Sequence, residues 1–113
     1  MMRESEKIIK EFADKLKRTE EYRLYIRKQE KVAEYPGLRE EINQYRKEYY
    51  MLQKSEEGLF DKLDEFEKKY NKMRSNPVVD EYLEAELAVC KMMQEVYAQI
   101  ADAIDLDIHS YLQ

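Results

Sequence analysis

The feature that most constrains the fold is an apolar stripe with heptad spacing between Pro36 and Ser75. One set of apolar residues recurs every seven positions: Leu38, Tyr45, Leu52, Leu59, Phe66 and Met73. A second set fills the other seam position and is interrupted once by Glu56: Ile42, Tyr49, Leu63 and Tyr70. This spacing keeps one stripe facing the same partner over many turns, which is typical of a long helix in a bundle or coiled coil. The pattern predicts one long helix that needs neighbouring helices to cover its stripe.

A glycine at position 58 is the weak point of this predicted helix. Gly58 costs about 1 kcal/mol relative to alanine in a helix interior, and Ser55 could cap a new helix there. Leu52 and Leu59 nevertheless stay seven residues apart, so the stripe keeps its phase across the glycine. We therefore expect one helix, bent at most near Gly58, rather than two.

The other helix boundaries follow from capping residues and prolines. A first amphipathic helix is predicted from Arg3 to about Lys17, and Thr19 is a good N-cap for a second. That second helix ends before Pro36, which is placed at the first position of the long helix. In Asn76-Pro77 an N-cap precedes a proline at the first helical position, so a last helix begins there. The short connection predicts that it runs antiparallel to the long helix.

The last helix carries two adjacent apolar stripes. The first comprises Val79, Tyr82, Val89, Met93, Val96 and Ile100, and the second comprises Leu83, Leu87, Cys90, Tyr97, Ala101 and Ile104. One antiparallel neighbour covers only one stripe, so we expect this helix to be covered on two sides, by the short N-terminal helices and by a second subunit in a two-fold dimer. The candidate subunit interface is Leu83, Leu87, Cys90 and Tyr97, although the pattern leaves open which stripe faces inward.

Composition limits the class of protein. The 113 residues are 40% charged and 43% hydrophobic, with two glycines and two prolines. These proportions favour a single all-α domain over residues 1–113, an antiparallel bundle of two short N-terminal helices and a long helical hairpin. A net charge of −5 without a basic face argues against direct nucleic-acid binding. Short apolar runs exclude a membrane span, and a single cysteine fits a reducing cytoplasm.

The sequence offers little for catalysis or metal binding. His109 is the only histidine; Asp105 lies four residues before it, a ligand spacing that still needs further ligands. Cys90 lies on an apolar face and is interpreted as a small buried hydrophobe rather than a reactive thiol. Glu56 and Glu86 interrupt apolar stripes and could mark a wet gap, a bend or a register-setting contact between subunits. We expect no catalytic residue, no cofactor and no metal.

Tyrosines and lysines have structural interpretations as well. Tyr45, Tyr49, Tyr70, Tyr82 and Tyr97 fall on seam positions, where an amphipathic ring packs its body and keeps its hydroxyl at the edge. We expect a core or subunit interface there rather than a base-stacking surface. The lysine pair at 68 and 69 is expected to be balanced by the acids four residues before it, on a solvated helix surface.

Packing and capping motifs carry a resemblance to a known family. The stronger match is Asn76–Glu86 (NPVVDEYLEAE) with the stretch Met92–Asp107, and the weaker one is Glu20–Tyr22 (EEY), Pro36–Ile42 (PGLREEI) and Tyr45–Lys47 (YRK). On these motifs, which cover the chain from about residue 5 to 107, the sequence resembles the YlbF/YmcA family of small all-helical bacterial proteins.

This resemblance implies a regulator without an active site. Some known members form a complex with each other and with a third protein. That complex supports competence, sporulation and biofilm formation and adjusts mRNA processing by a membrane-bound endoribonuclease. The best-characterised members carry cysteines in a C-terminal extension that is implicated in iron–sulfur binding. Here the chain ends at Gln113 and its one cysteine lies in mid-helix, so no cluster is expected.

Three function classes follow. We expect a cytoplasmic, non-enzymatic regulatory or adaptor protein that acts through protein–protein contacts. Its expected partners are a second copy of itself, paralogous family members or a ribonuclease complex. The alternative is an RNA-binding accessory factor of such a complex, and a metal-dependent hydrolase is the third class, disfavoured for want of ligands.

Overall fold

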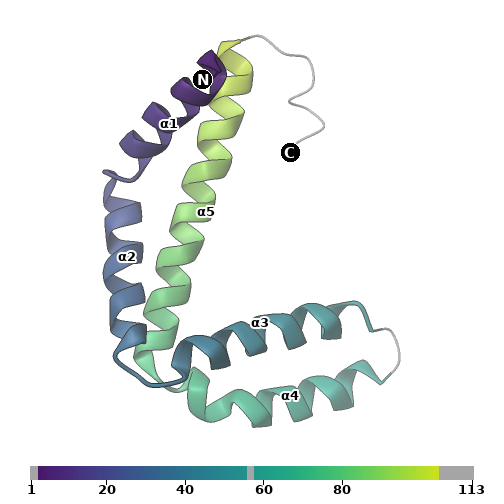
Figure 1. Ribbon diagram of the computed structural model, residues 1–113. Coiled ribbons are helices and arrows are strands. Elements are labelled where there is room, and N and C mark those ends of the chain that lie inside the picture. The colour runs from purple at the N-terminus through teal and green to yellow at the C-terminus, as the bar shows by residue number, and fades with distance from the viewer. Residues whose placement is uncertain (1–2, 56–57, 105–113) are drawn as a thin grey trace. The chain divides into compact units, whose positions relative to one another are not determined.

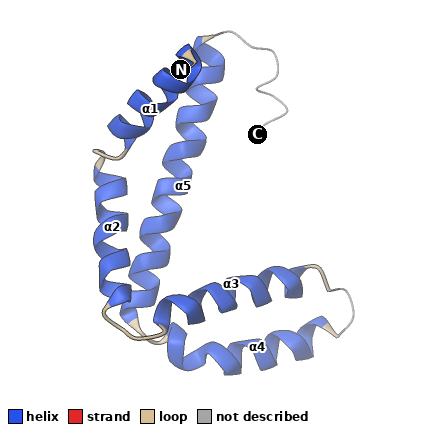
Figure 2. Cartoon of the chain, in the orientation of Figure 1, coloured by secondary structure: helices blue, strands red, loops and turns tan. Residues whose placement is uncertain are grey.

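The computed structural model describes residues 3–55 and 58–104, and every regular element in these ranges is a helix (Figures 1 and 2). The elements are α1 (Glu4–Leu16), α2 (Glu20–Ala33), α3 (Leu38–Gln53), α4 (Leu59–Arg74) and α5 (Pro77–Ala103). The predicted all-α class is confirmed. The residues Glu56, Asp105 and His109, which were considered above, lie outside the described ranges.

Two predicted N-caps are confirmed by hydrogen bonds. The Tyr22 N–H donates to Thr19 Oγ1 (3.4 Å) at the start of α2. The Val78 N–H donates to Asn76 Oδ1 (3.0 Å) at the start of α5. Each side chain thereby satisfies a backbone donor that has no partner within its helix.

The predicted start of the next helix is wrong by two residues. Pro36 lies in the turn rather than at the first helical position, because Gly37 adopts a left-handed conformation (φ +77°) and α3 begins at Leu38.

The prediction of one long helix over 36–75 is wrong. The helix ends at Gln53, and a second helix, α4, begins at Leu59 after Gly58, which has a φ of +62°. Glycine adopts this left-handed conformation without the steric cost that a side chain adds. The chain reverses there, and α3 and α4 pack against each other as an antiparallel pair (Figure 1). The two halves of the heptad stripe cover each other, so α4 pairs with α3 in place of the predicted pairing with the last helix.

Replacing Gly58 with alanine should therefore destabilise the hairpin through the backbone alone. A Cβ at this position would meet only the Lys62 Cε, at an ordinary 3.9 Å, so no clash contributes. We expect a loss of about 1 kcal/mol, the cost of a left-handed conformation for a residue with a side chain. Urea unfolding of Gly58→Ala measures this. A stabilised variant would indicate that α3 and α4 are continuous.

The described chain divides into two compact units. Unit 1 comprises residues 1–26 and 84–113, and unit 2 comprises Arg27–Leu83, so α2 and α5 each contribute to both. The expectation of a single folding domain stays a prediction, and one cooperative unfolding transition would support it.

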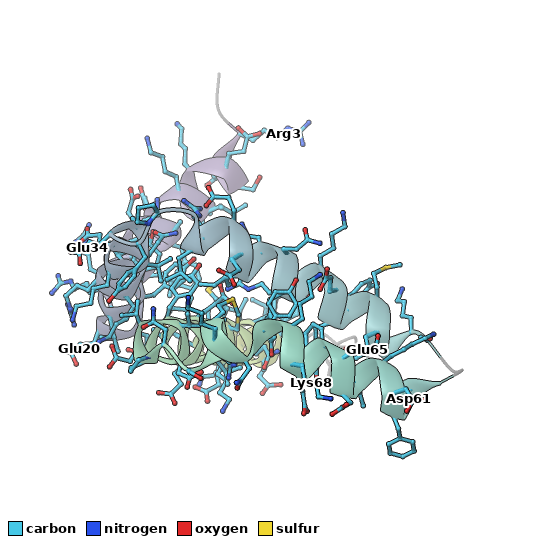
Figure 3. The ribbon with its side chains drawn as sticks, turned by 90° about the horizontal axis from the view of Figure 1, so that it is seen from below. Arg3, Glu20, Glu34, Asp61, Glu65 and Lys68 are labelled. Atoms are coloured by element: carbon cyan, nitrogen blue, oxygen red, sulfur yellow. The ribbon has the colours of Figure 1, made fainter. Side chains whose placement is uncertain are left out.

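Unit 2 contains most of the core. Its buried side chains are Val32, Leu38, Ile42, Tyr70, Met73, Val79 and Tyr82. Ion pairs flank them: Lys28 Nζ lies 3.0 Å from Glu81 Oε2, and Arg74 Nη2 lies 2.8 Å from Asp80 Oδ1. Asp61, Glu65 and Lys68 are exposed charged residues of α4 (Figure 3).

Unit 1 buries much less. Ala85 and Ala101 are its only buried residues among those described, and α1 has none. Ile8, Ile9 and Phe12 on α1 are exposed, although they form the apolar face that its sequence predicts. The apolar surface of this unit is therefore the feature that calls for a functional explanation.

Candidate interaction surface on α5

A row of apolar side chains lies exposed along the part of α5 that belongs to unit 1. Leu87 and Tyr97 retain 54% and 55% of their accessible surface. The exposed row, which we call the α5 row, is Leu87, Cys90, Met93, Tyr97, Ile100 and Ile104. The Ile104 N–H donates to the Ile100 carbonyl oxygen (3.0 Å), so the helical pattern extends to the end of the row.

The first predicted stripe is the more buried one on α5: its Val79 and Tyr82 are buried, whereas Leu87, Cys90 and Tyr97 of the second are exposed. Ala85 is buried, and the half-buried residues around it are Ala88, Val89, Met92 and Val96. Met93 and Ile100, from the first predicted stripe, retain 45% and 43% of their accessible surface, whereas Ala101, from the second, is buried.

Three of the four candidate interface residues belong to the α5 row. Leu87, Cys90 and Tyr97 are exposed in the single chain, whereas Leu83 is half-buried and belongs to unit 2. The interpretation of Cys90 as a buried residue is therefore wrong for the single chain.

The spacing within the row is that of a coiled-coil seam. Cys90, Met93, Tyr97, Ile100 and Ile104 follow one another at intervals of three and four residues, as seam positions do. Glu86 occupies the preceding seam position and is half-buried. At about 100° per residue, Glu84, Glu95 and Asp102 lie on the opposite side of the helix. The seam is thus apolar over most of its length while the acids of the same segment face away from it.

The hairpin of unit 2 is held by an aromatic cluster between α3 and α4. The Phe66 ring lies 5.0 Å from that of Tyr45 and 5.1 Å from that of Tyr70, measured between centroids. Tyr45 and Tyr70 meet edge to face at 5.2 Å, a favourable geometry for aromatic pairs. The expectation that the seam tyrosines pack in a core is confirmed for Tyr70 and Tyr82, which are buried.

An ion pair closes one side of this cluster. The Lys69 Nζ lies 2.6 Å from Glu48 Oε1, so the pair links α4 to α3. Lys68 binds Asp64 four residues away (2.9 Å) as predicted, whereas Lys69 finds its acid across the hairpin. The ammonium of Lys69 and then the hydroxyl of Tyr70 lower the pKa of Glu48 to about 2. Burial, and then the neighbouring Glu48, raise the pKa of Tyr70 to about 12.

The lowered pKa of Glu48 stabilises the fold, because Lys69 holds the charged carboxylate in the folded protein. The Tyr70 hydroxyl is buried beside Glu48 without a hydrogen bond of good geometry. The sequence analysis missed this network because Glu48 and Lys69 are far apart in the chain and meet only when it reverses at Gly58.

Acid should weaken unit 2 through Glu48. The pKa of Glu48 is lower in the folded protein than in the unfolded chain, so its contribution to stability is complete above its ordinary pKa of 4.5 and is lost as pH falls toward about 2. Because Lys69 is mostly exposed, we expect the pair to contribute only about 1 kcal/mol. Urea unfolding at pH 6 and pH 3 measures the loss. The Lys69→Met variant should be less stable than the wild type at pH 6, and it should lose less stability between pH 6 and pH 3. If its stability depends on pH as that of the wild type does, the assignment to Glu48 and Lys69 is wrong.

A shallow groove lies on one face of the hairpin. Its volume is about 480 Å³, and its lining includes Lys47, Met51, Leu52, Lys62 and Phe66. The Lys62 Nζ donates to Ser55 Oγ (2.7 Å) across one end. Glu48, Glu65 and Lys69 also line this groove.

Two further searches of the described residues bear on function. They contain no group of three or more histidine, cysteine or acidic side chains that could hold a metal ion. None of the helices that the structure describes is long and apolar enough to cross a membrane.

Comparison with known proteins identifies the family. Residues 6–105 match the family described as "Control of competence regulator ComK, YlbF/YmcA". A UPF0342 protein of Caldicellulosiruptor bescii is 28% identical over 92% of this chain and 91% of its own length. A UPF0342 protein of Desulfitobacterium hafniense is 29% identical over 83% of this chain and 79% of its own length. No solved structure gives a significant match. The family match covers nearly the whole chain, so this protein belongs to the YlbF/YmcA family.

Proposed function

We propose that this protein is a cytoplasmic, non-enzymatic regulatory adaptor that acts through protein–protein contacts, the first of them with a second copy of itself. The observation that carries the proposal is the α5 row. Isolated exposed leucines are common on soluble proteins, but a contiguous apolar row with coiled-coil spacing marks a surface that binds another protein.

The energetics favour coverage of this row. Burying a leucine-sized side chain completely is worth roughly 1.5–3 kcal/mol. Cys90 is exposed, and the other five residues of the row retain between 43% and 59% of their accessible surface. Covering them would contribute several kcal/mol, which is comparable with the whole stability of a small domain. A two-fold dimer covers the same row on both subunits at once.

The regulatory part of the proposal is supported by the family, whose description refers to control of a competence regulator. The finer proposal is that paralogous family members or a ribonuclease complex bind the dimer. This proposal can be tested by affinity capture from the native host followed by mass spectrometry. The Tyr97→Glu variant serves as the control bait. Family members or ribonuclease subunits that are recovered with the wild type would support the proposal. Recovery of neither would contradict the finer assignment of partners.

A specific observation supports a second candidate function, that of an RNA-binding accessory factor. Phe60 is 88% exposed near the end of the hairpin, and Tyr50 is also exposed, with the Lys54 Nζ 4.4 Å from its ring centroid. Exposed rings beside lysines are used to stack bases of single-stranded RNA.

We expect binding to single-stranded RNA no tighter than micromolar at physiological salt, because the chain carries a net charge of −5. A gel-shift titration measures this, with Tyr50→Ala/Phe60→Ala as the paired variant. Nanomolar, salt-sensitive binding that the double substitution abolishes would establish the second candidate instead.

A further inference from the structure

We infer that the groove on the α3–α4 hairpin binds a small amphipathic anion, a carboxylate that carries an alkyl chain. The residues that line this groove all belong to unit 2. The inference goes beyond the proposed self-association and does not depend on it, because the α5 row belongs to unit 1.

The groove has the size and the apolar floor of a small-molecule site. Its volume of about 480 Å³ falls within the range of roughly 300–1,000 Å³ that such sites occupy. Met51, Leu52 and Phe66 supply its apolar lining, and Met51 is 61% exposed. An alkyl chain that lies on these side chains removes its own apolar surface and theirs from water, which is favourable. The lining therefore favours an amphipathic ligand over a small hydrophilic ion.

Two lysines of the lining carry a charge that no acid balances. Lys62 donates to the hydroxyl of Ser55 (2.7 Å), which positions the ammonium group without neutralising it. Lys47 forms no ion pair within the described ranges. Lys69, by contrast, is neutralised by Glu48 at 2.6 Å. The groove thus keeps positive charge at two positions beside its apolar floor.

The net charge of the lining selects an anion. Lys47, Lys62 and Lys69 face two acids, Glu48 and Glu65, so the lining has a net charge of +1, whereas the whole chain has −5. One monovalent anion restores neutrality in the groove. A cationic amphiphile would add to the positive charge, and a neutral amphiphile would gain only the apolar contacts.

The two ends of the groove differ, and this difference orients the ligand. At one end a carboxylate can accept a charge-assisted hydrogen bond from the Lys62 ammonium. At the other end Lys69 is already bound, and the low pKa of Glu48, about 2, keeps a negative charge there that repels a second carboxylate. The carboxylate of the ligand is therefore placed at Lys62, and its alkyl chain extends over Leu52 and Phe66.

Octanoate, a carboxylate with an eight-carbon chain, is the probe that tests this inference. In a titration followed by NMR, octanoate should shift the amide signals of the groove residues with a dissociation constant below about 1 mM. Octanol, which has the chain without the charge, and acetate, which has the charge without the chain, should each bind more weakly by about five-fold or more. Equal binding of octanol would overturn the assignment to an anion, and the absence of shifts at about 1 mM octanoate would overturn the site.

Substitutions locate the charge that is recognised. Lys62→Gln should weaken octanoate binding about three- to five-fold, and Glu65→Gln should strengthen it about two-fold, because the first removes the partner of the carboxylate and the second removes an acid from the lining. Lys72→Gln is the matched control, since Lys72 is an exposed lysine of α4 outside the groove. Circular dichroism checks that all three variants remain helical. Equal weakening by Lys62→Gln and Lys72→Gln would show that only the net charge of the chain matters, and the inference would fail while self-association stands.

Discussion

Replacing Tyr97 with glutamate is expected to convert the dimer into a folded monomer. Tyr97 is 55% exposed in the single chain, so the substitution leaves the packing of unit 1 largely unchanged. In the dimer the new carboxylate would be buried in an apolar seam without a partner, which costs about 3 kcal/mol or more. The dissociation constant should therefore rise by at least 100-fold.

Light scattering coupled to size exclusion, at low micromolar concentration, measures this change. Gln99→Glu is the matched control, because it adds the same charge to an exposed position on another side of α5. The control should remain dimeric. If the wild type has a mass near 13.8 kDa and full helicity, the chain is a folded monomer in which no second copy covers the α5 row. The proposal of self-association then fails.

Truncating Ile42 to alanine is expected to have the largest effect on stability. Ile42 is 1% exposed and lies in the core of unit 2 with Leu38 and Val79. Removing a fully buried isoleucine side chain to its Cβ costs roughly 2–5 kcal/mol, because apolar contacts are lost and a cavity remains. A small domain has a total stability of about 5–15 kcal/mol, so this loss takes much of it.

Thermal and urea unfolding followed by circular dichroism measure the effect. Ile8→Ala is the matched control, since Ile8 is 60% exposed on α1 and should change the free energy of unfolding by less than about 0.5 kcal/mol. Equal effects of the two substitutions would show that α1 is buried to the same extent as unit 2, against the structure.

Local sequence determined where most helices begin. Thr19 and Asn76 cap helices through their own side chains, and Pro77 fits the first helical turn because it lacks an N–H that would need a partner. These are interactions between neighbours in the chain, so they can be recognised without knowledge of the rest of the fold. The same holds for the all-α class, which follows from helical periodicity and the scarcity of glycine and proline.

Only the tertiary structure decided how the apolar stripes are used. Leu52 and Leu59 keep heptad spacing whether the chain continues or reverses, so the pattern could not reveal the hairpin that Gly58 allows. The pairing of Lys69 with Glu48 rather than with Glu65 depends on that reversal. On α5, apolar residues cover more of the helix than one neighbour needs. Val79 and Tyr82 of the first stripe are buried whereas Leu87 and Tyr97 of the second are exposed, because burial depends on what packs against a face and not on that face alone.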